Sequence, residues 1–179
     1  MAKVLREWLA RYLPQAAETV LWNTMRLRVT SYCCIELPPE DLITSVRAVV
    51  CNAQHVLVVR DPVSAHILPG GRRELGESLQ QTLRREVLEE TGWEIDDIRM
   101  LGIKHFHHLT PKPVDYPYPY PDFLQAIYRA MPQSYLASAR QTNGYELDAT
   151  LVPRSVVEHL PLSASERLFL RVALQQLDS

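Results

Sequence analysis

The stretch that decides the fold runs from Gly70 to Trp93 and reads Gly-Gly-Arg-Arg-Glu-Leu-Gly-Glu-Ser-Leu-Gln-Gln-Thr-Leu-Arg-Arg-Glu-Val-Leu-Glu-Glu-Thr-Gly-Trp. A glycine-rich turn comes first, and a segment that is dense in carboxylates follows it. Ser78 and Gln81 have the spacing of a capping box, and Gly92 can adopt the left-handed conformation that ends a helix. The pattern therefore predicts a helix over residues 79–91.

Three acids of this helix lie on one side. Glu86 and Glu90 are four residues apart, and Glu89 is three beyond Glu86, so their side chains project from the same face. Like charges at this spacing repel one another, and the carboxyl end of a helix disfavours negative charge. A hard divalent cation takes oxygen ligands and would offset both costs. The alternative is a solvated face whose acids pair with Arg84 and Arg85.

The turn and the helix share a fixed register. Gly71, five residues, Glu77, seven residues and Arg85-Glu86-Val87-Leu88-Glu89-Glu90-Thr91-Gly92 follow in that order. This arrangement resembles the Nudix box, the motif of the Nudix hydrolase family, at every fixed polar and glycine position. Trp93 departs from the pattern, because the family usually has an aliphatic residue there, and we expect the change to affect packing more than chemistry.

The chemistry of the acids and the family resemblance together indicate a metal site. Mg²⁺ or Mn²⁺ prefers a few carboxylates together with water and substrate oxygens. We therefore expect Glu86, Glu89 and Glu90 to be metal ligands. The resemblance implies that a backbone carbonyl at Gly70 or Gly71 completes the protein's share.

The resemblance also implies supporting roles. Arg85 would orient the acids by ion pairing, chiefly with Glu77, and so serve catalysis without touching the metal. The general base comes from the box in some Nudix enzymes and from a later loop in others. Glu146 is the best candidate outside the box, because it stands where a loop meets a strand that would face the helix. The candidates that stay open are Glu86, Glu89, Glu146 and Asp148.

Composition and charge set limits on the class of protein. The 179 residues are 46% hydrophobic, which can fill one sizeable core, and we expect a single domain over 1–179. With 19 basic and 21 acidic residues the formal charge is −2, so no general basic field is available to hold nucleic acid. The N-terminus has no secretory signal pattern, and no apolar run is long enough to span a membrane. We therefore expect a cytoplasmic protein whose cysteines, Cys33, Cys34 and Cys51, are reduced thiols.

Residues 1–40 are expected to form an extension of helices and a strand. Apolar spacing predicts a helix over 3–13 that Pro14 ends, a second short helix over 15–23, and a strand over 25–33. The first helix is expected to pack on the domain's own core. The alternatives are a homodimer contact or a cap over the substrate.

The remaining elements follow from strand and helix patterns. Residues 45–51 and 56–60 read as a β-hairpin. Further strands are expected over 98–106, 123–130 and 145–152, followed by a short helix over 153–159 and a capped helix over 163–177. Strands mixed with helices predict an α/β fold, a Nudix-like α/β/α sandwich with a mixed sheet, which the family resemblance also implies.

Two polar and aromatic clusters lie outside the box. His105 and His107 point to one face of a strand and His108 to the other, and because no cysteine or acid completes a tetrahedral set, we interpret them as ordinary polar or ligand-contacting histidines. Residues 111–123 alternate prolines with tyrosines, which favours a stiff loop that can hold aromatic rings for a nucleobase. This loop resembles the Pro-Trp-Pro-Phe-Pro stretch of the NADH pyrophosphatases in the family. The expected substrate-binding residues are Arg28, Tyr118, Tyr120 and Phe123.

The leading functional hypothesis is a metal-dependent hydrolase of the pyrophosphate bond in a nucleoside diphosphate linked to another moiety, such as ADP-ribose or a dinucleotide. Its partner is then a small-molecule nucleotide. The alternatives are a nucleoside triphosphate pyrophosphatase with a house-cleaning role and a non-catalytic nucleotide sensor. Capped-RNA processing is disfavoured, because no basic stripe is available for an RNA backbone.

Overall fold

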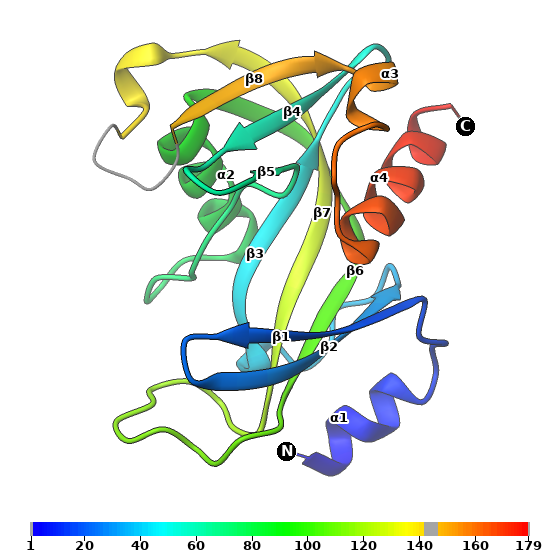
Figure 1. Ribbon diagram of the computed structural model, residues 1–179, viewed down its shortest axis with the longest axis vertical. Helices are drawn as coiled ribbons and strands as arrows, with labels where there is room; N and C mark the ends of the chain where they lie inside the picture. The colour runs from blue at the N-terminus through cyan, green and yellow to red at the C-terminus, as the bar shows by residue number, and fades with distance from the viewer. Residues whose placement is uncertain (1, 142–146, 179) are drawn as a thin grey trace.

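The computed structural model describes residues 2–141 and 147–178, and its strands form two sheets (Figure 1). The larger sheet has the strand order β1-β2-β6-β7-β3, and the smaller has the order β5-β4-β8. Strands β3 and β7 pair in parallel, whereas the other pairs in the larger sheet are antiparallel, so that sheet is mixed as predicted. The strands are β1 (Ala16–Trp22), β2 (Met25–Cys33), β3 (Ile43–Val50), β4 (His55–Arg60), β5 (Ala65–His66), β6 (Trp93–His108), β7 (Asp122–Tyr135) and β8 (Asp148–Pro153).

Helices cover both faces of the larger sheet. The α-helices are α1 (Ala2–Leu9), α2 (Leu79–Thr91), α3 (Arg154–Val157) and α4 (Ala164–Leu177), and short 3-10 turns occupy Glu40–Leu42 and Ala137–Ala139. Leu83 and Val87 of α2 pack into one core cluster, while Phe169 and Leu170 of α4 pack into another. Burying each of these side chains stabilises the fold by roughly 1.5–3 kcal/mol. The result is the expected α/β/α arrangement.

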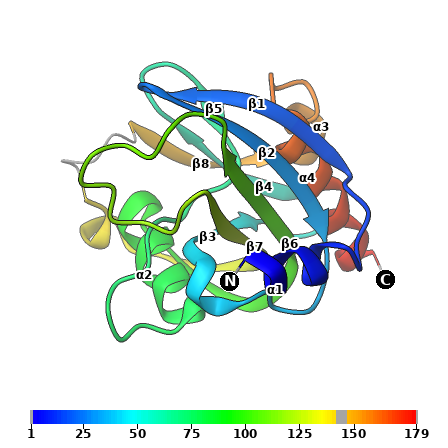
Figure 2. The ribbon, with the colours of Figure 1, turned by 90° about the horizontal axis from the view of Figure 1, so that it is seen from below.

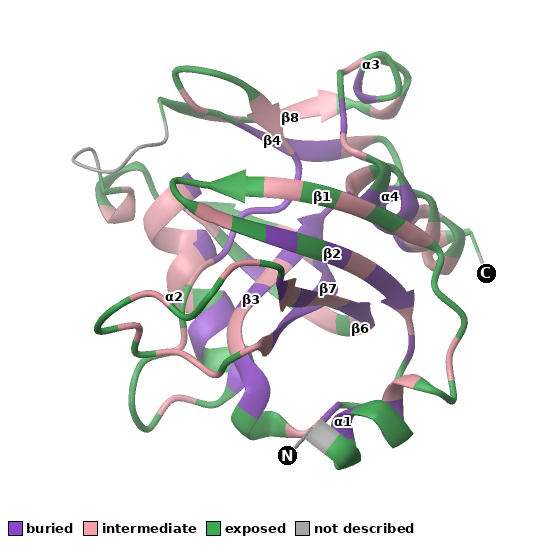
Figure 3. Cartoon of the chain, turned by 60° about the horizontal axis from the view of Figure 1, so that its bottom comes forward, coloured by how far each residue is buried: buried purple, intermediate pink, exposed green. Residues whose placement is uncertain are grey.

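The N-terminal helix packs on the body of the molecule. Leu5 is 2% exposed and Trp8 is 8% exposed, and both belong to the same core cluster as the inward side of α2. Figure 3 shows α1 with buried and exposed residues alternating along it, as expected for an amphipathic helix. This agrees with the expectation of core packing. None of the described helices is both long and apolar enough to cross a membrane.

The prediction of a second helix over residues 15–23 is wrong. These residues form β1, which pairs with β2 along its whole length from Ala16 opposite Ser31 to Trp22 opposite Met25. Ala-Ala-Glu has good local helix propensity, but cross-strand pairing and the partial burial of alternate side chains outweigh it. Asn23, with a φ of 52°, forms the tight turn that joins the two strands.

The predicted hairpin of residues 45–51 and 56–60 is also wrong in its pairing. Strand β3 belongs to the larger sheet and pairs with β7, whereas β4 pairs with β5 and β8 in the smaller sheet. A single bridge, between Cys51 and Val56, joins the two segments where they part. Val56 to Val59 are all at most 1% exposed, so β4 is buried on both faces and lies between two layers.

The loop that joins β6 and β7 extends from the same end of the sheet as the β1–β2 turn, as Figures 1 and 2 show. The Leu109 N–H donates to the Arg26 carbonyl at 2.8 Å, which ties the start of the loop to β2. The remaining strand and helix predictions are confirmed with shifted ends, most clearly in β6, which begins at Trp93 directly after the box helix. Of the strand expected over 145–152, residues 145 and 146 lie outside the described residues, and residues 148–152 belong to β8.

Candidate active site

The box helix begins and ends as its sequence predicts. The Ser78 side chain accepts a hydrogen bond from the Gln81 N–H, and the Gln81 side chain accepts one from the Ser78 N–H, which is the reciprocal capping box. At the other end Gly92 has a φ of 77° and its N–H donates to the Leu88 carbonyl. These caps satisfy backbone groups that would otherwise lack partners, and they fix the rotation of the acidic face.

The glycine turn brings its backbone against the acids. The Gly70 N–H donates to Glu90 Oε2 at 2.7 Å, and the Gly71 carbonyl accepts from the Val46 N–H at 2.9 Å. A Cβ added at Gly71 would lie 2.1 Å from Glu86 Oε2. The turn is therefore held between β3 and α2, and Gly71 leaves room for the Glu86 carboxylate.

Arg85 is the central cation of the acidic face. Its Nε and Nη2 atoms donate to the two carboxylate oxygens of Glu77 at 2.7 and 2.9 Å, which is a bidentate pair. Its Nη1 atom donates to Glu86 at 3.0 Å and to Glu89 at 3.2 Å. Hydrogen bonds from Arg85 lower the pKa of Glu77 to about 2, although partial burial opposes this, and bonds from Thr82 and the Glu74 N–H add to the effect.

The box carboxylates fit an open magnesium site more than an enclosed one. Glu86 and Glu89 are 17% and 33% exposed and share the Arg85 guanidinium, while Glu90 reaches back to Gly70. Among the described residues, the groups whose ligand atoms all lie within 4.8 Å of one another do not include Glu86, Glu89 and Glu90 together. Mg²⁺ binds through one or two carboxylates and completes its shell with water and substrate oxygens, so this donor set suits it. Of the two carbonyls expected as ligands, that of Gly71 already accepts a hydrogen bond from the Val46 N–H.

Two candidate general bases, Glu146 and Asp148, lie outside the box, and the structure describes only Asp148. Glu146 lies outside the described residues. Asp148 begins β8, is exposed, and accepts a hydrogen bond from the Thr150 hydroxyl at 2.7 Å. On the other side of the undescribed segment, the Gln141 N–H donates to the Glu89 carbonyl at 2.8 Å. The chain therefore enters this segment directly beside the acidic helix.

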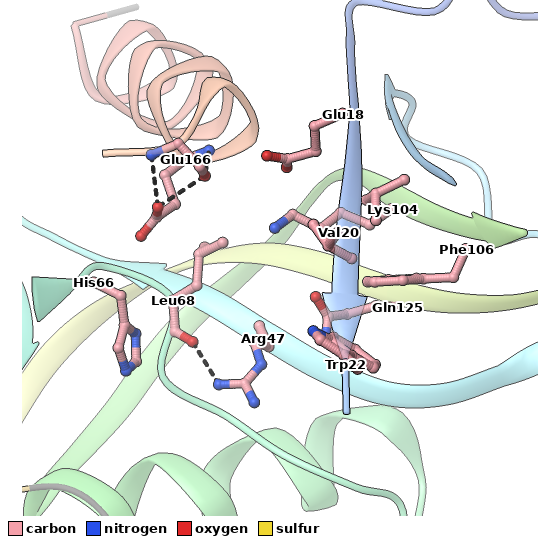
Figure 4. A pocket seen from close by; sticks show the side chains of 12 residues that line it. Glu18, Val20, Trp22, Arg47, His66, Leu68, Lys104, Phe106, Gln125 and Glu166 are labelled. Carbon is pink, nitrogen blue, oxygen red and sulfur yellow. Dashed lines mark hydrogen bonds between the residues drawn. The ribbon is translucent and has the colours of Figure 1, made fainter. Parts of the chain in front are cut away.

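A cavity of about 450 Å³ opens on the α4 side of the larger sheet (Figure 4). Its lining comes from six strands, from Leu68 in the loop after β5 and from the start of α4. The lining residues include Glu18, Trp22, Arg47, Lys104, Phe106 and Glu166. A second cavity of about 190 Å³ is lined by Gly71, Arg72, Tyr116, Tyr118 and Phe123 among others. Both cavities are lined by Trp22, Arg47 and Gln125, so they adjoin and connect the glycine turn to the larger space.

Charged groups of both signs face the larger cavity. Burial lowers the pKa of Lys104, and the carboxylates of Glu166 and Glu18 act in the opposite direction. Glu18 accepts from the Ser165 hydroxyl, and Glu166 accepts from the Ile67 N–H. Arg47 donates to the Leu68 carbonyl at 2.8 Å, as the dashed line in Figure 4 marks. These contacts hold the cavity's polar groups in fixed positions.

The expected substrate-binding residues separate into two groups. Tyr118 and Phe123 line the smaller cavity, and Phe123 stacks on Phe106 with ring centroids 4.7 Å apart and planes 7° apart. Tyr120 packs beside His108 and donates to the Thr110 carbonyl instead of lining either cavity. Arg28 is exposed on the opposite face of β2 from Leu27 and Val29, which pack with Phe106 and Phe123.

Several cavity residues were not expected from the sequence, namely Trp22, Arg47, Lys104, Phe106 and Gln125. Trp22 was hidden by the mistaken helix, although the alternation of Glu18, Val20 and Trp22 could have indicated a strand. The other residues lie on three strands, β3, β6 and β7, and only the sheet order brings them together.

Comparisons with known proteins agree with this geometry. The chain is 30% identical over 95 residues to the NAD-capped RNA hydrolase NudC of Vibrio vulnificus (strain CMCP6), a match that covers 51% of this chain and 36% of that protein. The fold is similar to that of a NUDIX hydrolase from Nitrosomonas europaea, with a TM-score of 0.57, 20% identity, and 75% and 90% of the two chains covered. It is also similar to the NUDIX domain of Shewanella oneidensis NrtR, solved with ADP ribose, with a TM-score of 0.54, 22% identity, and 79% and 94% covered.

The match to NudC thus spans only about a third of the length of that relative. The family model described as the NUDIX domain matches residues 41–171, which include the glycine turn, the acidic helix and most of both sheets. The chain therefore belongs to the NUDIX domain family.

Proposed function

We propose that this protein hydrolyses the pyrophosphate bond of a nucleoside diphosphate linked to another moiety, of the ADP-ribose or dinucleotide type, with Mg²⁺ or Mn²⁺. The observation that carries the proposal is the continuity of the site. Gly71 lies against Glu86 and lines the smaller cavity, which adjoins the larger one through Trp22, Arg47 and Gln125. A pyrophosphate beside the acids thus has space for a bulky group on the α4 side of the sheet.

An aromatic surface in this space supports recognition of a nucleobase. Trp22 lies 5.2 Å from Phe106 and 6.4 Å from Phe123, measured between ring centroids, and it is 46% exposed. Bases stack on aromatic rings of this kind, with about 1–3 kcal/mol per base. We propose that Trp22 and the Phe106–Phe123 stack contact the base, and that Tyr118 contributes at the side of the box.

Cations near the glycine turn support binding of the phosphates. Arg47 and Arg72 both line the smaller cavity, and the Arg72 guanidinium lies 4.8 Å from the centre of the Tyr118 ring. A guanidinium offers several N–H donors to phosphate oxygens, and its place over a ring limits its motion. These residues would orient the pyrophosphate toward the acids of α2.

The acids and Arg85 would position the reacting groups. A bound divalent ion neutralises phosphate charge and lowers the pKa of a bound water. We propose Glu86, Glu89 and Glu90 as its carboxylate ligands, with the Gly70 carbonyl beside them. Arg85 orients Glu86 and Glu89 through its contacts at 3.0 and 3.2 Å. Glu146 is the proposed base, and Glu86, Glu89 and Asp148 are the alternatives.

The relatives favour the same substrate class. NudC is described as acting on NAD-capped RNA, and the NrtR domain was solved with ADP ribose. Both molecules contain a nucleoside diphosphate joined to a second group. The proline and tyrosine pattern of residues 117–121, which resembles a stretch of the NADH pyrophosphatases, is consistent with that class and supplies Tyr118 to the smaller cavity.

A substrate panel tests the proposal. Purified protein is assayed with ADP-ribose, NADH, dinucleoside polyphosphates and nucleoside triphosphates, each with Mg²⁺ and with Mn²⁺, and the products are identified. We expect release of a nucleoside monophosphate and a phosphorylated second moiety. The double variant Glu86→Gln with Glu90→Gln should lose this activity, whereas the exposed control Glu158→Gln should keep it. Pyrophosphate release from triphosphates alone would favour the house-cleaning reaction, and binding without turnover would favour a sensor.

A further inference from the structure

A second cluster of ligand-type side chains lies at the paired ends of β6 and β7. His105 Nε2 is 2.8 Å from Asp122 Oδ1, and His107 Nδ1 is 2.7 Å from the same oxygen. The three ligand atoms lie within 4.8 Å of one another. Among the described residues, this is the group of three histidines, cysteines or acids whose ligand atoms are all that close together. The expectation that no acid completes the histidine set is therefore wrong, because Asp122 pairs directly opposite His107.

This cluster is separate from the two cavities. Lys104 and Phe106 line the larger cavity, and side chains alternate along a strand, so His105 and His107 face the other side of the sheet. Leu124, which pairs with His105, packs in the core cluster of α1 and α2. The cluster thus shares no residue with either cavity or with the box.

The donor set indicates a class of cation. Two imidazoles and one carboxylate suit Zn²⁺ and related late transition ions better than Mg²⁺, which prefers oxygen ligands. Ligands about 2.0–2.2 Å from a tetrahedral Zn²⁺ are separated from each other by about 3.3 Å. The two histidine–aspartate spacings of 2.8 and 2.7 Å need about half an ångström of expansion to match this, and the two histidine nitrogens lie within 4.8 Å of each other. His107 is 33% exposed, which leaves access for water in the fourth position.

We propose that His105, His107 and Asp122 form a Zn²⁺-type binding site on the face of the sheet opposite the larger cavity. The site joins the last residues of strand β6 to the first residue of β7, at the base of the loop over residues 109–121. Tyr116 and Tyr118 of this loop line the smaller cavity. A bound ion therefore fastens the base of a loop whose far part contacts the cleft.

Arg28 provides an internal check on this assignment. It pairs with His107 across the β2–β6 ladder, and its charge acts on the neighbouring His105. A guanidinium on the neighbouring strand, paired with a ligand residue, opposes a bound cation. If the ion sits among these three side chains, the neutral variant Arg28→Gln should bind it severalfold more tightly than the parent.

The experiment is Zn²⁺ binding by tag-free, full-length protein in competition with a chromophoric chelator. The double variant Glu86→Gln with Glu90→Gln serves as background, so that the box cannot contribute. We expect one equivalent of Zn²⁺ bound with micromolar or tighter affinity. Asp122→Asn or His107→Gln should weaken it at least tenfold, while the exposed control His159→Gln should leave it unchanged.

A second readout separates loss of the site from loss of folding. Thermal unfolding of each variant is recorded without metal and again with Zn²⁺, and the added ion should raise the midpoint of the background protein but not that of Asp122→Asn. Co²⁺ should give visible bands typical of nitrogen and oxygen ligation in the background protein only. The proposal is overturned by absence of binding at 100-fold excess, by unchanged affinity in a folded Asp122→Asn protein, or by weaker binding in Arg28→Gln.

Discussion

Two adjacent glycines of the box give opposite predictions for substitution by alanine. At Gly71 the added Cβ would lie 2.1 Å from Glu86 Oε2, 2.4 Å from its Cδ and 2.7 Å from its Oε1. A normal contact requires more than 3 Å, so the carboxylate must move by about 1 Å. Because it is the end of a flexible side chain, it can move at small cost to the fold. A displacement of 1 Å at a reacting centre can reduce the rate by about 100-fold.

At Gly70 the neighbour is backbone and cannot move away. The added Cβ would lie 2.3 Å from the Val46 carbonyl oxygen and 2.8 Å from Arg47 Cα, and the φ of Gly70 is 132°, which side chains rarely adopt. Strained backbone of this kind costs about 1–3 kcal/mol before the overlap with β3 is added. We expect Gly70→Ala to lower the free energy of unfolding by about 3 kcal/mol or more.

Two measurements on the same preparations check this pair. For Gly71→Ala, kcat/KM with Mg²⁺ on the best substrate of the panel should fall by about 100-fold, while urea unfolding should change by less than about 1 kcal/mol. For Gly70→Ala, urea unfolding should show the larger loss. Parental activity in Gly71→Ala would refute the placement of Glu86 beside the turn and its role as a ligand. Equal destabilisation by the two substitutions would refute the distinction between a movable side chain and fixed backbone.

Three further predictions concern other groups of the site and core. Glu77→Gln should lower the free energy of unfolding by about 1.5 kcal/mol at pH 7. Because Arg85 lowers the Glu77 pKa from 4.5 to about 2, this difference from the parent should persist down to about pH 4.5 and shrink as the pH falls toward 2. Urea unfolding measured across this pH range checks it. Trp22→Ala should raise KM by about 5- to 150-fold with a smaller change in kcat, if the ring stacks on the base beside Phe106; steady-state kinetics that show the loss in kcat alone would contradict it. Burial raises the pKa of Cys34 to about 12, so mass spectrometry should find it unmodified after iodoacetamide treatment of the folded protein at pH 8 and modified in urea.

The sequence was most informative where the signals were local. The caps of α2 lie within a few residues of the helix they limit, so Ser78, Gln81 and Gly92 predicted its ends correctly. The acidic face follows from helical spacing alone. The Arg85–Glu77 pair came from the family resemblance, and the structure confirms it as a bidentate contact across eight positions of the chain.

Prediction failed where distant pairing decides the structure. Residues 16–22 have no strong preference by themselves, and the ladder with β2 makes them a strand. Strands β3 and β4 follow one another closely and resemble a hairpin, yet the parallel partner of β3 is β7, which lies about 80 residues later in the chain at Leu124 opposite Ile43. Pairing over such separations cannot be inferred from the residues of adjacent turns. The residues of the cleft that these strands line could therefore not be predicted from the sequence either.

Strand β6 shows how one sequence segment can serve two sites. Its side chains alternate, so Lys104 and Phe106 reach the cleft while His105 and His107 reach Asp122 on the far side. The contiguous run of polar and aromatic residues in β6 therefore contributes to two sites, and interpreting it as one cluster misses both the cleft and the cation site. The alternation also limits how each side can change, because a one-residue slip in the β6–β7 register would exchange the two faces and remove both sets of contacts at once. The β6–β7 pairing, which continues to His107 opposite Asp122, is thus the common support of the proposed cleft and the proposed cation site.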